Sequence, residues 1–165
     1  MGLDIVALEN VELVRAESEE EGDPPEDDDL VYLYPNEDFP AQADGITPGA
    51  YRGKGGRHEF RAGSYSGYNE WRERLAALVD TTPEKVWAGA IAPAFGELIN
   101  FADNEGTIGP KTSAKLAKDF DAWRARAETW AKKLPGEEGA GFMQSYDDWR
   151  KAFTLAANGG AIQLC

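Results

Sequence analysis

Histidine and cysteine are almost absent from this chain of 165 residues, which contains one of each, His58 and Cys165. A zinc site built on these side chains needs three or four of them, so that class of site is excluded. Paired-histidine phosphodiester chemistry and Cys/His nucleophilic catalysis are excluded for the same reason. A Ser-His-Asp triad would have to use His58, and no G-x-S-x-G motif is present to hold its serine. The composition therefore excludes most catalytic repertoires that depend on histidine or cysteine.

Long apolar runs and nucleotide motifs are also missing. No run approaches the roughly 18 residues needed to span a bilayer, and the first residues carry no cationic stretch typical of a secretory signal. The glycine-rich stretch at residues 53–56 lacks the G-x-x-x-x-G-K-[ST] spacing of a P-loop. We expect a cytoplasmic protein with no membrane contact and no cofactor.

Basic residues are scarce in the first 50 positions, where 15 acids accompany a single base, Arg15. The densest part, residues 17–29, has no apolar side chain except those of two prolines, so it cannot offset the entropy of ordering. We expect a mobile acidic loop at about residues 16–29. The alternative is an acidic arm that binds a basic partner or imitates nucleic-acid phosphate. With a formal charge of −13, direct nucleic-acid binding is not expected.

Aromatic residues are plentiful, with five Trp, seven Phe and six Tyr. A chain of this length and apolar content is expected to form a single domain over residues 1–165. Trp71, Trp123, Trp130 and Trp149 lie on apolar stripes of helical spacing, which favours core positions over ligand contacts. Trp87 fits its stripe less clearly.

The first half of the chain is predicted to form mainly strands. Residues 3–14 alternate loosely between apolar and polar side chains, which predicts a strand or a bent hairpin arm. Residues 30–34 predict a second strand that could pair antiparallel with the first. Residues 35–56 hold many prolines and glycines without a period, which predicts an irregular connection. Residues 58–62 predict a third strand.

The second half of the chain is predicted to form mainly helices. Apolar residues at spacings of three and four predict a helix that ends near Asp80, a long helix over residues 110–134 and a final helix that includes residues 142–156. Thr82 and Pro83 predict a helix start, and residues 95–102 a short helix. Residues 161–164 predict a last strand beside the first. The predicted fold is α+β, a small, mainly antiparallel sheet of N- and C-terminal segments packed against four to five helices.

The turn at residues 63–68 is the strongest candidate site. It joins a basic strand to a helix, and the unpaired N–H groups and positive dipole of a helix start favour an anion. Ordinary capping by Ser64 or Ser66, with Tyr68 in the core, explains the same turn equally well. The candidate ligand-binding residues here are Arg61, Ser64, Tyr65, Ser66, Tyr68 and Arg72.

The loop at residues 103–109 is the second candidate. Its acid-x-acid-Gly pattern resembles part of a calcium loop, but in that register Phe101 and Thr112 occupy positions that need carboxylates. We therefore predict no metal site, although Asp103 and Glu105 could form a weak magnesium site. The alternative is a turn in which Gly106 and Gly109 take positive φ. Asp103 and Glu105 are counted as candidate ligand-binding residues.

These two segments carry a resemblance to a recurrent group of small phage, prophage and bacterial proteins, which spans most of residues 59–165. The resemblance implies a phage or prophage context and no catalytic residue, and the acidic stretch at 17–29 departs from the pattern. The matching motifs are the Met-Gly-Leu-Asp-Ile start, Gly63-Ser64-Tyr65-Ser66-Gly67-Tyr68 with Trp71-Arg72, Asn100-Phe101 with Asp103, Glu105-Gly106 and Ile108-Gly109, and Ala114-Lys115-Leu116-Ala117 with Asp119-Phe120.

Together these observations predict a non-enzymatic binding protein, in a phage context an inhibitor of host defence or a sequestering protein. Its ligand would be a small phosphate-bearing anion, or a segment of a partner, held between the two loops. One alternative is a small hydrolase or transferase acting on a phosphorylated substrate through Asp103 or Glu105. Another is an acidic inhibitor that binds a basic partner through residues 17–29. The sequence leaves the oligomeric state open.

Overall fold

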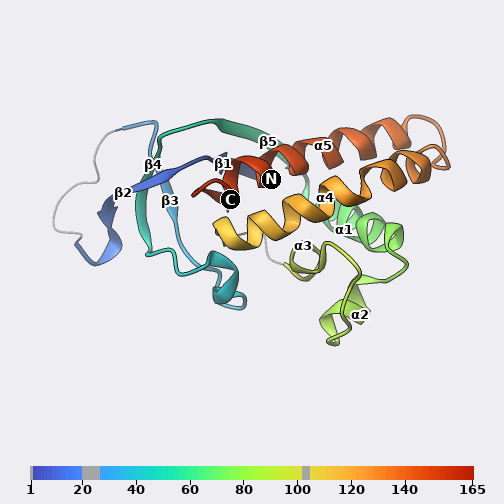
Figure 1. Ribbon diagram of the computed structural model, residues 1–165, viewed down its shortest axis with the longest axis horizontal. Helices are drawn as coiled ribbons and strands as arrows, with labels where there is room; N and C mark the ends of the chain where they lie inside the picture. The colour runs from blue at the N-terminus through green and yellow to red at the C-terminus, as the bar shows by residue number, and fades with distance from the viewer. Residues whose placement is uncertain (1, 20–26, 102–104) are drawn as a thin grey trace.

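The computed structural model describes residues 2–19, 27–101 and 105–165 (Figure 1). These residues form two antiparallel sheets and five α-helices, which confirms the α+β class. The smaller sheet lies at one end of the molecule and the turn between the two longest helices at the other (Figure 1). Residues 20–26, within the predicted mobile loop, and Asp103 lie outside the described residues.

The larger sheet has the strand order β5-β1-β7-β6. Its strands are β1 (Leu3–Leu8), β5 (Arg57–Gly63), β6 (Gly106–Ile108) and β7 (Ala161–Leu164). The predicted neighbourhood of the first and last strands is confirmed, because Ile5 pairs with Leu164 and Leu8 with Ala161. The strand β6 was not predicted, since three residues are too few to show a period.

The smaller sheet has the order β2-β4-β3 and corrects three predictions. Residues 3–14 form two strands in different sheets, because the chain turns at Asn10 (φ 51°) before β2 (Val11–Ala16). The predicted pairing of the second strand with the first is wrong: β3 (Val31–Leu33) pairs with β4, which lies between β2 and β3. β4 (Gly49–Gly53) also replaces part of the predicted irregular connection. A Cβ at Gly49 would lie 2.3 Å from the Arg15 carbonyl oxygen, so its glycine permits the close pairing.

The helices largely match their predictions. They are α1 (Tyr65–Leu78), α2 (Pro83–Trp87), α3 (Gly96–Asn100), α4 (Pro110–Ala131) and α5 (Glu138–Ala156), with 3-10 turns η1 (Glu17–Glu19) and η2 (Pro40–Ala43). The Thr82 cap is confirmed, because its side chain accepts a hydrogen bond from the Lys85 N–H. Positive φ is confirmed at Gly106 but wrong at Gly109, whose φ is −84°. At Gly109 the missing side chain instead allows close approach to Ala43.

The main core lies between the larger sheet and the helices, with α4 and α5 packed side by side (Figure 1). Trp71 and Trp149 are buried in it and Trp123 and Trp130 pack against it, which confirms their core assignment. Trp87 is 48% exposed. A second, smaller core joins the two sheets; its buried members are Leu8, Val31, Leu33, Tyr51 and Ala161. Among the described residues no helix is long and apolar enough to cross a membrane.

Candidate functional site

The turn before α1 is a helix cap in this structure. The Ser64 Oγ accepts a hydrogen bond from the Gly67 N–H at 3.1 Å and lies 3.0 Å from the Ser66 Oγ. Such a cap contributes about 1 kcal/mol to helix stability. The ring of Tyr65 is 41% exposed beside it. Both serines therefore have partners within the turn, while the tyrosine faces solvent.

Tyr68 and Arg72 are buried and hold α1 against the end of α3. The Tyr68 hydroxyl donates to the Phe101 carbonyl at 3.1 Å. The Arg72 guanidinium, whose residue is 3% exposed, donates to the Ile99 carbonyl at 2.9 Å and packs over the Tyr68 ring. Burial raises the pKa of Tyr68 and lowers that of Arg72. Both side chains thus make internal contacts and are not presented to a surface ligand.

Arg61 lies at the end of the larger sheet, among acids. Its Nε is 3.1 Å from the Asp4 Oδ1, and both side chains are exposed. Close by, partial burial and the carboxylates of Asp4, Glu105 and Glu59 raise the pKa of the Cys165 thiol. The field at this end of the sheet is therefore negative despite the arginine.

Glu105 lies at the same end of the sheet but at its opposite edge. It precedes β6, whereas the capping turn follows β5, and β1 and β7 run between them. Neighbouring strands are about 4.8 Å apart, so these two edges are separated by about 14 Å. Arg61 and Glu105 therefore do not share one compact site.

Glu105 instead lines a hollow of about 640 Å³ beside the smaller sheet, together with residues of η1, of β3 and of the segment that follows β3. We call this hollow the tyrosine–acid pocket. It combines aromatic rings, prolines and carboxylates from segments far apart in the chain. Its lining residues are Glu17, Tyr32, Tyr34, Pro35, Asn36, Glu37, Asp38, Pro48 and Glu105.

Two tyrosines form the aromatic wall of this pocket. Tyr32 lies in β3 and Tyr34 follows it, so the two side chains point to the same face of the strand while Leu33 points to the opposite face, into the smaller core. The two ring centroids are 6.0 Å apart and the rings are tilted by 39°. Tyr32 is 39% exposed. The wall is therefore open to solvent on one side and fixed by buried packing on the other.

Asn36 fixes the chain that follows the wall. It is 5% exposed, and its Oδ1 accepts hydrogen bonds from the N–H groups of Asp38 (2.8 Å) and Phe39 (3.1 Å). Its Nδ2 donates to the Glu105 carbonyl at 2.9 Å. A Cβ at Gly106 (φ 123°) would lie 2.7 Å from the Asn36 Cβ. The glycine thus lets Glu105 approach this turn.

A buried hydrogen-bond chain joins the two sheets behind the pocket. The Tyr34 N–H donates to the Thr107 Oγ1 at 3.0 Å, and the Thr107 hydroxyl donates to the Gln163 Oε1 at 2.8 Å. Thr107 and Gln163 are both buried. Because buried polar groups left without partners are costly, this chain anchors the Tyr34 backbone to β6 and β7.

The charge of the pocket is of one sign. Glu17, Glu37, Asp38 and Glu105 line it, and no basic residue does so among the residues that the structure describes. Nor do three or more His, Cys, Asp or Glu side chains in that part of the chain cluster closely enough to hold a metal ion. The carboxylates therefore give the pocket a negative charge, which attracts cations.

Two acids of this pocket were candidates from the sequence, Glu105 as a ligand-binding residue and Glu17 within the acidic stretch at 17–29. The two tyrosines, Glu37 and Asp38 were not, because residues 32–38 were assigned to a strand end and an irregular connection. The available signal was a Tyr-x-Tyr pair followed by two adjacent acids, Glu37 and Asp38. Two aromatic side chains on one face of a short strand make that face unusually apolar. Such a face next to two acids indicates a candidate binding surface.

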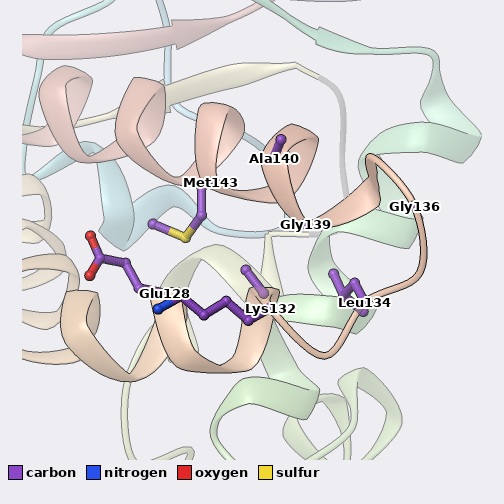
Figure 2. Close-up of a pocket in the computed structure, with 8 residues that line it drawn as sticks. Glu128, Lys132, Leu134, Gly136, Gly139, Ala140 and Met143 are labelled. Carbon is purple, nitrogen blue, oxygen red and sulfur yellow. The ribbon is translucent and has the colours of Figure 1, made fainter.

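A second hollow, of about 520 Å³, lies between the end of α4 and the start of α5. Figure 2 shows Met143 reaching from α5 toward α4, where Glu128 and Lys132 lie along the helix. A Cβ at Gly139 would lie 2.3 Å from the Ala131 carbonyl oxygen, so the glycine allows the two helices to approach. We interpret this hollow as the end of a tightly packed helical hairpin.

The remaining observation comes from comparison with known proteins. No model of a protein family, no curated protein and no solved structure matches the chain. The resemblance to phage and prophage proteins stays a prediction. The geometry of the pocket is therefore the basis on which a function can be proposed.

Proposed function

We propose that the protein is a non-enzymatic binding protein that holds a positively charged segment of a partner protein in the tyrosine–acid pocket. The main support for this proposal is the lining of that pocket. It comprises two tyrosine rings and four acids, and no base is found among its described residues. Cations bind favourably over aromatic faces and beside carboxylates. A pocket that combines both suits a basic side chain.

The charges around the other candidate favour this proposal over an anionic ligand. Arg61 is paired with Asp4, and Arg72 is buried with its guanidinium bonded to Ile99. Residues 1–50 carry 15 acids and one base, so long-range attraction also favours a basic partner. In a phage context, covering a basic surface of a host protein would make this an inhibitor.

The proposal is tested by fluorescence anisotropy with a labelled octapeptide in which arginines and lysines alternate with glycines. We expect saturable binding that weakens as salt is added, because salt screens exposed charges. In the double variant Glu37→Gln/Asp38→Asn the affinity should fall about two- to thirtyfold. This range corresponds to two exposed ion pairs of about 0.2 to 1 kcal/mol each.

A matched control separates the pocket from the net charge. The double variant Glu73→Gln/Glu84→Gln removes the same number of charges from α1 and α2, outside the pocket. It should bind the peptide nearly as well as the wild type. Equal losses in the two double variants would show that the peptide responds to overall charge, and the pocket proposal would be abandoned.

A further inference from the structure

We infer that the tyrosine–acid pocket selects an arginine side chain over a lysine, and that this arginine belongs to a basic segment of a partner protein. The inference depends on the proposed function and specifies its ligand. Three features of the pocket carry it: the arrangement of the two rings, the placement of the carboxylates and the fixed position of the wall.

The two rings form a surface and not a cage. Their centroids are 6.0 Å apart and their planes are tilted by 39°, and they are the two aromatic rings among the described residues that line the pocket, so they do not enclose it. A compact ammonium group is held best where several rings surround it. A planar guanidinium can stack flat on such a wall, and stacking on aromatic faces distinguishes arginine from lysine.

The carboxylates come from three separate segments around this wall. Glu17 belongs to η1, Glu37 and Asp38 follow β3, and Glu105 precedes β6. A guanidinium carries five N–H donors in a planar fork and can meet carboxylates in more than one direction while it stacks. An ammonium group has three donors on one atom and a stronger hydration shell. The spread of acids therefore favours the larger cation.

The backbone that carries the wall is anchored by internal hydrogen bonds. Asn36 holds the turn through three hydrogen bonds, and the Thr107–Gln163 chain anchors the Tyr34 backbone. A preorganised surface loses less freedom on binding, which increases its ability to discriminate between ligand shapes. This rigidity supports selection by the planar shape of the cation and not by charge alone.

Charge complementarity identifies the occupant as a basic segment and not a free cation. The pocket itself carries four acids, and the first 50 residues as a whole carry 15 acids against one base. A segment with further basic residues beside the bound arginine gains attraction that a single amino acid cannot.

The test uses three labelled peptides of sequence Gly-Lys-Gly-X-Gly-Lys-Gly, where X is arginine, lysine or citrulline. The arginine and lysine peptides have equal charge, and citrulline keeps the planar shape without the charge. We expect the arginine peptide to bind at least tenfold more tightly than either of the others. Free arginine should compete only at far higher concentrations than the unlabelled peptide.

Two variants of Tyr32 test whether its aromatic ring selects the arginine peptide. Tyr32→Leu should weaken binding of the arginine peptide about two- to fivefold, the loss expected for an exposed cation–π contact, and weaken binding of the lysine peptide by a smaller factor. Tyr32→Phe keeps the ring and should preserve the selectivity. Circular dichroism of both variants checks that they are folded.

The outcomes distinguish this inference from the proposed function. If the arginine and lysine peptides bind within twofold of each other, arginine selection is wrong while the binding of basic segments stands. If no peptide binds saturably, the proposed function fails as well. If free arginine competes as well as the arginine peptide, the ligand is a small molecule and the partner segment is wrong.

Discussion

Gly106→Ala should destabilise the protein by about 2 to 6 kcal/mol. Gly106 has a φ of 123°, which L-residues rarely adopt, and holding alanine there costs about 1 to 3 kcal/mol. The added Cβ would also lie 2.7 Å from the Asn36 Cβ and 3.1 Å from its backbone N. Overpacking of this kind costs about 1 to 3 kcal/mol more. Because Asn36 is held by three hydrogen bonds, it cannot move away without losing some of them.

Urea denaturation followed by tryptophan fluorescence measures this loss. Gly136→Ala is the matched control, because Gly136 also has positive φ (56°) but has no neighbour within 4 Å of the added Cβ. The control should lose only about 1 to 2 kcal/mol, the penalty of the left-handed conformation. If Gly106→Ala were no more destabilising than the control, the close contact with Asn36 would not constrain the pocket and the reasoning would be refuted.

Three further predictions concern other parts of the larger sheet. Thr107→Val keeps the side-chain volume but leaves two buried hydrogen-bond partners unsatisfied, so urea denaturation should show a loss of about 2 to 6 kcal/mol, from about 1 to 3 for each; a neutral result would mean that water replaces the hydroxyl. The raised pKa of Cys165 predicts that iodoacetamide alkylation will increase at a higher pH than for a free cysteine, and Asp4→Asn should lower that pH, since removing a carboxylate favours the thiolate. If Asp4→Asn left the pH profile unchanged, the carboxylate would not act on the thiol. The anionic ligand predicted at Arg61 is tested by thermal shift with a panel of nucleotides, and stabilisation that is lost in Arg61→Ala would restore that hypothesis.

The helical half of the fold was predictable because its signals are local. Apolar spacings of three and four residues place Phe142, Tyr146 and Trp149 on one face of α5. Caps such as Thr82 and breakers such as Pro135 mark where helices begin and end. Such features involve residues within one or two turns of one another, so the sequence shows them directly.

The strands were less predictable because their pairing partners are distant. β4 begins and ends with glycine and shows no alternation, and it is held by partners on both sides. β6 has only three residues. Both β4 and β6 are held by pairing with neighbouring strands. No local sequence pattern indicates which strands these neighbours will be.

The candidate site, like the fold, was predictable only where its signals are local in the sequence. Glu105 was recognised as a site residue, but its association with Tyr32 and Tyr34 depends on contacts between residues about 70 positions apart, such as Asn36 with Glu105. Arg72 was assigned to a ligand, whereas in the structure its charge is partly compensated by the Ile99 carbonyl inside the protein. Its spacing of four residues from Tyr68 and three from Leu75 places Arg72 on the buried face of α1, so the periodicity of the helix did carry a local sign of its burial.

The position of β7 has a consequence for the order of folding. β7 lies between β1 and β6, so the larger sheet remains incomplete until residues 161–164 have been synthesised. At a synthesis rate of 5 to 20 residues per second, β1 precedes its partner by about 8 to 30 seconds. β5 can pair with one edge of β1 soon after Gly63 appears, but the other edge stays open throughout this interval. An open strand edge can pair with another chain, so the nascent protein is most exposed to misassembly along Ile5–Leu8, the residues that β7 later covers.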